Sequence, residues 1–213
     1  MILEDTDSQV TSPFGNLRRD RGKYLRFVKR AQQRPWLSLF KVYSLPGFQA
    51  IAVHRFGEWA AAAPRALRHI LMPLHFLMHT WIRIAWGIDI IRTATIGPSF
   101  YIGHFGGIVM SGAAVIGENC SISHGVTIGV GGTGERSGAP TIGNGVYIGP
   151  GAKIFGKIRI GDGAKIGANA VVNCDIAPGA IAYLSPGFVI HEDSLGASTE
   201  NEGGQTRLGE GHS

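Results

Sequence analysis

The 213 residues carry a formal net charge of +5 and 44% of them are hydrophobic, which excludes a disordered chain and allows one or two small domains with a buried core. Glycine, with 32 residues, is about twice as common as usual, and its concentration after residue 95 indicates a turn-rich repeat. The two cysteines, Cys120 and Cys174, have neither metal-site nor disulfide-framework spacing. We therefore expect no bound metal and a cytoplasmic protein.

Residues 1–35 are expected to form a basic, partly disordered arm. Most of the excess positive charge lies between residues 17 and 30, at Arg18, Arg19, Arg21, Lys23, Arg26, Lys29 and Arg30. Such a run is typical of a solvated face, or it forms a peripheral contact with an anionic membrane surface through Leu25, Phe27, Val28 and Trp36. No aromatic-basic platform accompanies the charges, so we expect no nucleic-acid partner.

Residues 36–88 are predicted to form an α-helical region. The stretches "PGFQAIAVHRFGEWAAAA" and "RALRHILMPLHFLMHTWIRIAWG" have helical apolar spacing, with a break near Pro64 and a kink at Pro73. The second stretch is strongly apolar, but a proline and several polar residues interrupt it, which argues against a transmembrane helix.

From residue 89 to 190 the dominant feature is an aliphatic residue at every sixth position. The longest uninterrupted series is Ile142, Ile148, Ile154, Ile160, Ile166 and Val172. Neither a helix nor an alternating strand has this period, whereas a parallel β-helix of hexapeptide repeats does. Each repeat forms one short strand with its aliphatic side chain inward, and three repeats close one coil. The polar residues 191–213 are predicted to be a disordered tail.

Two insertions interrupt the period, and the longer one places residues 130–140 in a projecting loop. His104 and His124 each follow an inward isoleucine by two residues, at Ile102 and Ile122. If those isoleucines stack in consecutive coils, the two imidazoles also stack, with Pro150 and Ala168 below them.

Several segments, in order and spacing, resemble the serine acetyltransferase family of hexapeptide-repeat acyltransferases. They are "SLPGFQAIAVHRFGEW", "GIDIIRTATIG", "YIGHFGGIVMSGAAVIG", "HGVTIG" and "PTIGNGVYIGPGAKIFGKIRIGDGAKIGANAVV". The resemblance implies a mainly β fold, a left-handed parallel β-helix preceded by a small helical region. It implies acetyl-CoA as co-substrate, and a homotrimer that binds CoA between neighbouring β-helices. A single trimer is expected, because the long helical domain of the full-length serine enzymes has no counterpart here.

The resemblance also implies roles for individual residues. The catalytic histidine of the family corresponds to His104, a general base for the acceptor hydroxyl, and its aspartate partner corresponds to Asp89. The CoA contacts correspond to Gly129, Gly131, Pro150, Lys165 and Ala168. For Lys165 we favour a solvated surface lysine over a specific phosphate contact. His124 is either a packing residue or a contact of the acceptor or CoA.

The chain departs from the serine enzymes where they bind the amino acid. Gly103 replaces an aspartate that directly precedes the catalytic histidine, and Gly138 and Ala139 replace an arginine and a histidine at the end of the loop. Arg136 is close in sequence, but its spacing differs. These losses favour an uncharged acceptor, so we expect a sugar hydroxyl, free or lipid-linked, as in the exopolysaccharide subgroup of the family.

Three alternatives stay open. The acceptor is L-serine, as in cysteine biosynthesis; or the acceptor is the nitrogen of an amino sugar; or the β-helix is a non-catalytic scaffold. A scaffold has no use for the pair His104 and Asp89, so those two residues distinguish it from an enzyme.

Overall fold

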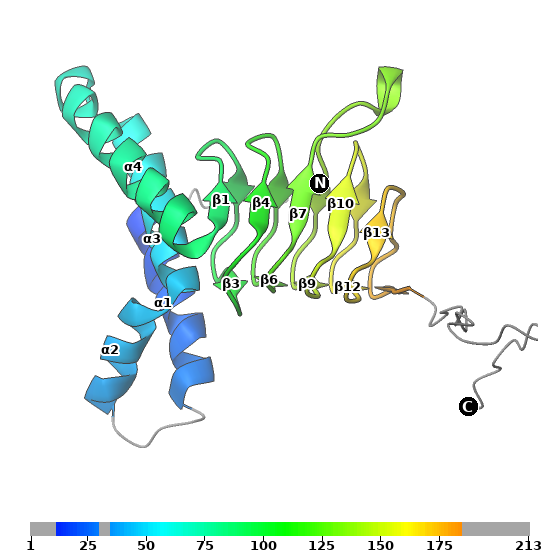
Figure 1. The fold of residues 1–213 in the computed structure, drawn as a ribbon, viewed down its shortest axis with the longest axis horizontal. Helices are drawn as coiled ribbons and strands as arrows, with labels where there is room; N and C mark the ends of the chain where they lie inside the picture. Colours follow the sequence, from blue (N-terminus) through cyan, green and yellow to red (C-terminus); the bar gives the residue numbers. More distant parts are fainter. Residues whose placement is uncertain (1–11, 30–34, 185–213) are drawn as a thin grey trace, which may run out of the picture.

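The computed structural model describes residues 12–29 and 35–184, which form a helical region followed by a parallel β-helix (Figure 1). The helices are α1 (Pro13–Lys29), α2 (Pro35–Ser44), α3 (Pro46–Ala62) and α4 (Arg65–Trp86). Three of them begin at a proline, whose fixed φ and missing N–H suit the first helical position. Pro73 lies inside α4, and that helix ends at Gly87, which has φ 61° and leads directly into the first strand.

The β-helix consists of short parallel strands on three faces. The first face contains β1 (Ile88–Ile90), β4 (Ile108–Met110), β7 (Thr127–Gly129), β10 (Lys153–Phe155) and β13 (Val171–Val172). The second contains β2 (Thr95–Ile96), β5 (Val115–Ile116), β8 (Thr141–Ile142) and β11 (Arg159–Ile160). The third contains β3 (Tyr101–Ile102), β6 (Ser121–Ile122), β9 (Tyr147–Ile148), β12 (Lys165–Ile166) and β14 (Ile181–Ala182). The expected fold class, a parallel β-helix after a helical region, is confirmed.

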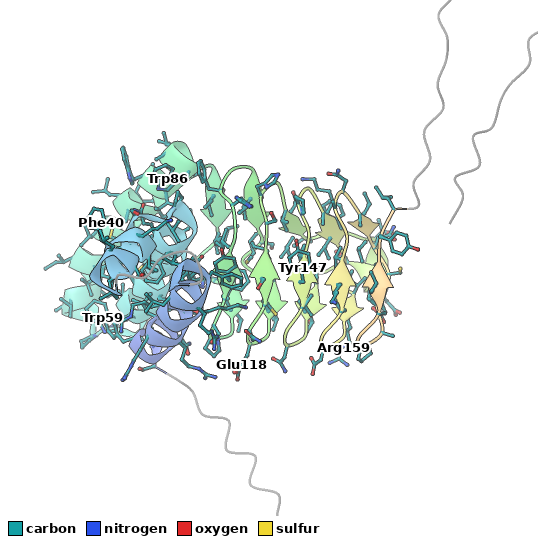
Figure 2. The ribbon with its side chains drawn as sticks, turned by 90° about the horizontal axis from the view of Figure 1, so that it is seen from below. Phe40, Trp59, Trp86, Glu118, Tyr147 and Arg159 are labelled. Carbon is teal, nitrogen blue, oxygen red and sulfur yellow. The ribbon has the colours of Figure 1, made fainter. Side chains whose placement is uncertain are left out.

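The period of six sets the register of the coils. On the third face Ile102 pairs with Ile122, Ile122 with Ile148 and Ile148 with Ile166, and all four side chains are buried. The strand residue before each inward isoleucine points outward, as do Tyr147 on the third face and Arg159 on the second, both labelled in Figure 2. Burial of one aliphatic column per face supplies the hydrophobic core of the β-helix.

The helical region is fixed to the first coil by a buried ion pair. The Arg55 Nε atom donates to Asp20 Oδ2 over 3.0 Å, and both side chains are almost fully buried. The same guanidinium donates to the carbonyl oxygens of Ile96 at 2.6 Å and Gly97 at 2.8 Å. Burial raises the pKa of Asp20, although the Arg55 charge acts in the opposite direction.

The segment expected to be a loose basic arm therefore contains a packed helix over residues 13–29. The Lys23 Nζ atom donates to the carbonyl oxygens of Asn119 and Cys120, and burial lowers the pKa of Lys23 to about 8. One face of α1 thus binds the β-helix, because its apolar residues alternate with the basic ones at helical spacing. The rest of that arm, 1–11 and 30–34, and the expected tail at 191–213 lie outside the described residues.

Among helices in the described residues, none has the length and apolar character needed to span a membrane.

Candidate active site

Two histidine rings meet at an exposed corner of the β-helix. The His104 and His124 ring centroids are 5.8 Å apart, with an interplanar angle of 77°, an edge-to-face contact. The pairing of Ile102 with Ile122 places them there, because each histidine follows its isoleucine by two residues. The prediction that the two imidazoles lie one above the other in consecutive coils is confirmed, although their ring planes are not parallel.

Glycines shape this corner. Gly106 and Gly107, which follow His104, have φ values of 101° and 64°, in the left-handed region that side chains with a Cβ atom disfavour. The N–H of Gly125 donates to the Gly106 carbonyl oxygen over 2.8 Å and so ties the two coils together. The corner therefore holds both histidines on fixed backbone while their rings face solvent.

His104 differs from His124 in its hydrogen bonds. The Nδ1 atom of His124 lies 3.3 Å from the Ser123 hydroxyl oxygen, which holds that ring in place. Within residues 12–29 and 35–184, the His104 ring makes no hydrogen bond or ion pair, and it meets the His124 ring. Both nitrogens of His104 are therefore available to a substrate, as a general base requires.

Asp89 has a different partner from the one expected. It lies at the centre of β1, and its Oδ1 atom is 3.3 Å from Nε2 of His79 on α4, an ion-pair distance without hydrogen-bond geometry. No hydrogen bond or ion pair joins Asp89 to His104 within the described residues. The expected direct contact between the two is thus not seen, because α4 runs into β1 and brings His79 to the Asp89 carboxylate first.

Gly103, which stands where the serine enzymes are expected to carry an aspartate, has space for a side chain. A Cβ atom at Gly103 would meet only Tyr101 Cε1 at 3.4 Å and the Ile122 carbonyl oxygen at 3.7 Å, which are ordinary van der Waals distances. Its φ lies outside the left-handed region. Glycine at this position is therefore not imposed by packing.

The loop at residues 130–140 leaves from the other end of β7. Gly131 and Gly138 pair across its base through two N–H···O=C bonds of 3.0 Å. A Cβ atom at Gly138 would lie 2.9 Å from Lys157 Cβ, so an arginine there would require Lys157 to shift. The Arg136 backbone belongs to a short 3₁₀ turn in this loop, while its side chain lies outside what the structure describes. Strand β7 therefore lies between the histidine corner and the loop.

The other residues assigned to CoA lie along the coils. Pro150 and Ala168 occupy the corner positions below His124, as the register of β6, β9 and β12 dictates, and Pro150 already accepts the Asn169 N–H through its carbonyl oxygen. Lys165 is exposed on β12. Gly129 ends β7, where a Cβ atom would lie 3.2 Å from the Phe155 ring. Pro150 and Ala168 thus share the corner column of the two histidines, whereas Gly129 lies on the first face and Lys165 on the third.

Two side chains near the site were missed by sequence reasoning. His79 was passed over because helical histidines without acidic neighbours in sequence resemble ordinary core residues. Lys153 donates from Nζ to the Gly125 carbonyl oxygen at 2.6 Å and to Thr127 Oγ1 at 3.1 Å, beside the His124 corner. The outward position of Lys153 in the hexapeptide repeat was the sequence feature that could have indicated its place beside this corner.

Among residues 12–29 and 35–184, no group of three or more His, Cys, Asp and Glu side chains is placed to hold a metal ion.

The chain is similar to proteins of known type along most of its length. A family model described as "Bacterial transferase hexapeptide (six repeats)" matches residues 139–174. The serine acetyltransferase of Helicobacter pylori strain 26695 is 39% identical over 150 residues, covering 70% of this chain and 83% of that protein. The serine acetyltransferase of Synechococcus elongatus is 36% identical over 157 residues, but the match spans 59% of that protein's length.

Solved structures show the same relationship. The soybean serine acetyltransferase apoenzyme is 36% identical with a TM-score of 0.64, and the alignment covers 80% of this chain and 67% of that one. The Entamoeba histolytica isoform 3, solved with cysteine, is 29% identical with a TM-score of 0.63, covering 85% of this chain and 63% of that one. These similarities, together with the hexapeptide β-helix, show that this chain belongs to the serine acetyltransferase family.

Proposed function

We propose that this chain is an acetyl-CoA-dependent O-acetyltransferase whose acceptor is the hydroxyl group of L-serine. The observation that carries the proposal is the exposed His104 ring, with both nitrogens available, at a glycine-shaped corner of the β-helix. The relatives, named serine acetyltransferases at 36 to 39% identity, support serine as the acceptor. We therefore propose serine as the first candidate acceptor, in place of the sugar hydroxyl that the sequence alone favoured.

The mechanism uses His104 as a general base. An alcohol is almost fully protonated at neutral pH, so an imidazole that removes its proton makes it a better nucleophile. The hydroxyl oxygen then attacks the thioester carbonyl carbon and forms a tetrahedral intermediate. When the carbon–sulfur bond breaks, the proton held by His104 passes to the departing thiolate, which leaves as free CoA. The acetyl ester is the other product.

Asp89 is proposed to act through position and charge. A carboxylate near an imidazole fixes its tautomer and stabilises the imidazolium that forms during transfer. In the described chain Asp89 instead faces His79, so this role requires the Asp89 side chain to turn away from His79. The proposed homotrimer supplies a groove between neighbouring β-helices for CoA, with Gly129, Gly131, Pro150, Lys165 and Ala168 along it.

A second candidate acceptor is a neutral sugar hydroxyl, as in exopolysaccharide biosynthesis. Gly103 and Gly138 favour it, because these positions offer neither an acid for an ammonium group nor a fork for a carboxylate. The open space at Gly103 would accommodate a larger uncharged acceptor. One assay separates the two candidates.

The test is thiol release from acetyl-CoA, measured with L-serine in one series and with free sugars and UDP-sugars in another. Each series includes His104→Ala and the control His69→Ala, an exposed histidine on α4 far in sequence from the site. Serine-dependent release that disappears only in His104→Ala supports the proposal. Release with sugars alone establishes the second candidate. Equal acceptor-dependent release by wild type and His104→Ala contradicts the assigned base. No release with any acceptor contradicts both candidate acceptors and leaves the scaffold interpretation.

A further inference from the structure

The most conspicuous unexplained surface is an apolar stripe on α4. Its residues are three or four positions apart and so lie on one helix face: Ile70, Leu74, Leu77, Trp81 and Ile84. Trp81 is 65% exposed and Ile84 is 75% exposed. Of the 22 residues of α4, only His75 and Ile82 are buried. Most of a long apolar helix is therefore left uncovered by the rest of the chain.

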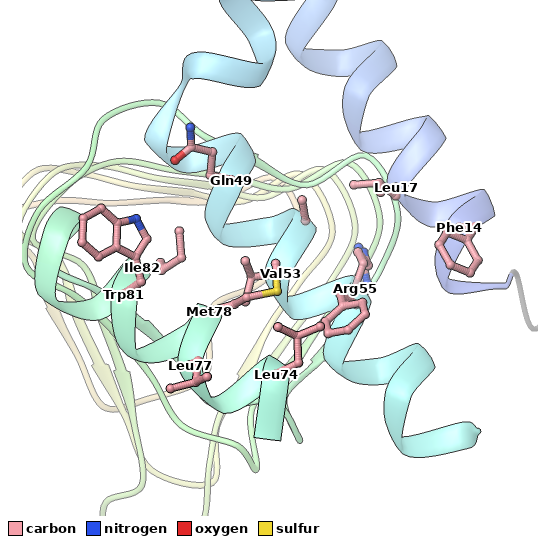
Figure 3. A pocket seen from close by; sticks show the side chains of 12 residues that line it. Phe14, Leu17, Gln49, Val53, Arg55, Leu74, Leu77, Met78, Trp81 and Ile82 are labelled. Atoms are coloured by element: carbon pink, nitrogen blue, oxygen red, sulfur yellow. The ribbon is translucent and has the colours of Figure 1, made fainter. Parts of the chain in front are cut away.

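An apolar groove continues this stripe toward α1. It has a volume of about 830 Å³ and lies between α1, α3 and α4. Phe14 and Leu17 line it from α1, while Leu74, Leu77 and Trp81 of the stripe line it from α4 (Figure 3). The stripe and groove together form one connected apolar surface, larger than the isolated exposed residues normal for a protein surface.

Charge indicates the nature of the partner. In the described helical residues the carboxylates are Asp20 and Glu58, and both are bound to Arg55. The exposed cations of the same region are Arg18, Arg19, Arg26, Lys41, Arg65, Arg68 and Arg83. Arg65, Arg68 and Arg83 lie on α4 itself. A surface with exposed cations and no unpaired carboxylate is complementary to an anionic partner.

The same charges favour an anionic partner over a second copy, because the helical region of a second copy offers no unpaired carboxylate to these cations. A 22-residue helix with aromatic and aliphatic residues on one face, and with Arg65, Arg68 and Arg83 on the opposite face, has the character of a helix that lies in a membrane interface. The absence of a membrane-spanning helix among the described residues agrees with lying on a bilayer rather than crossing it.

We propose that α4 docks along its stripe onto an anionic phospholipid bilayer, with its arginines at the headgroups. The sequence suggested a membrane contact through the basic N-terminal segment together with the apolar helix at residues 70–88. In the structure Phe27 stacks on Tyr101 with ring centroids 4.2 Å apart, and Val28 is buried, so these two apolar residues of the basic segment are already packed within the chain. This proposal holds for any acceptor, because it does not involve the histidine corner.

The experiment is co-sedimentation of the full chain with vesicles. One set contains phosphatidylcholine and phosphatidylglycerol, and the other contains phosphatidylcholine alone. We expect at least about tenfold stronger partitioning into the anionic vesicles, weakened by raising NaCl from about 0.1 M to about 0.5 M. Equal binding to both vesicles, or no binding to either, would overturn the proposal.

Charged substitutions locate the contact. Leu77→Asp and Trp81→Asp should each lower partitioning by about tenfold or more, because a carboxylate would have to enter the interface. The control Val115→Asp, an exposed apolar residue on the second face of the β-helix, should bind like wild type. Loss of binding in the control as well would refute α4 as the contact. Light scattering measures the molar mass of the same proteins. A higher molar mass for wild type than for Trp81→Asp, together with no binding to vesicles, would identify a second copy as the occupant and overturn the proposal.

A conservative variant keeps the proposal testable if the charged variants do not fold. Trp81→Phe preserves the apolar stripe and should still bind anionic vesicles. Tryptophan fluorescence of the wild type should be quenched by bromine-labelled acyl chains, and this quenching should decrease in Trp81→Phe. Quenching that is the same in both proteins would contradict the insertion of Trp81.

Discussion

The carboxylate of Asp89 lies 3.3 Å from Nε2 of His79, so a side chain of α4 contacts the residue that we propose as the partner of the catalytic base His104. Asp89 therefore has two possible roles: it anchors α4 through His79, or it orients His104. Substitution of Asp89 separates them, because only the second role affects the rate of the reaction.

Asp89→Asn should lower kcat by about 100-fold or more while leaving the KM for acetyl-CoA nearly unchanged, because the neutral amide no longer stabilises the imidazolium. His79→Gln removes the competing partner and should change kcat by less than about tenfold. Steady-state thiol release across pH 6 to 9 measures both. Equal losses in the two variants would show that Asp89 serves only to anchor α4.

His124→Asn tests whether the second ring works or packs. His124 is exposed, held by Ser123 and in edge contact with His104, so its loss should lower kcat/KM by less than about tenfold. His104→Ala, compared under the same conditions, should lose about 1,000-fold or more, the usual range for a general base. A comparable loss in His124→Asn would assign it to the reaction.

Gly103→Asp should raise kcat/KM for L-serine relative to a neutral acceptor by several-fold, because the added carboxylate can pair with an ammonium group beside His104. The site accepts the side chain at ordinary contact distances. Gly103→Asn, which has the same shape without the charge, is the control. If both variants change the acceptor ratio equally, the effect is steric and the electrostatic argument is wrong.

Arg55→Met should lower the free energy of unfolding by about 3 to 5 kcal/mol, because it leaves the Asp20 carboxylate buried without its partner. Urea unfolding measures the loss. Arg19→Met removes an exposed ion pair with Glu118 and should cost about 1 kcal/mol or less. Adding Asp20→Leu to Arg55→Met should restore part of the stability, and no recovery would point to the carbonyl contacts of Arg55 instead.

Acid should destabilise the fold through His75. Burial lowers the pKa of His75 to about 4, and the charges of His79 and Arg92 act in the same direction. Between the ordinary value of 6.5 and about 4, the unfolded chain binds a proton that the folded chain does not. The free energy of unfolding should therefore fall by about 3 kcal/mol as pH falls through this window. His75→Gln, compared by thermal unfolding at pH 7 and pH 4.5, should show a smaller decrease; an equal decrease would assign the effect to other groups.

The sequence alone determined the β-helix and the meeting of two of its histidines. A period of six leaves one inward aliphatic residue per strand, so hydrophobic burial fixes the register, and a constant offset from Ile102 and Ile122 then fixes His104 beside His124. Tertiary structure decided the rest. The contact of His79 with Asp89, the burial of Asp20 with Arg55 and the exposure of the α4 stripe depend on how helices dock on the first coil. Such contacts join residues far apart in sequence, and side-chain packing between unlike elements leaves no periodic trace from which they could be predicted.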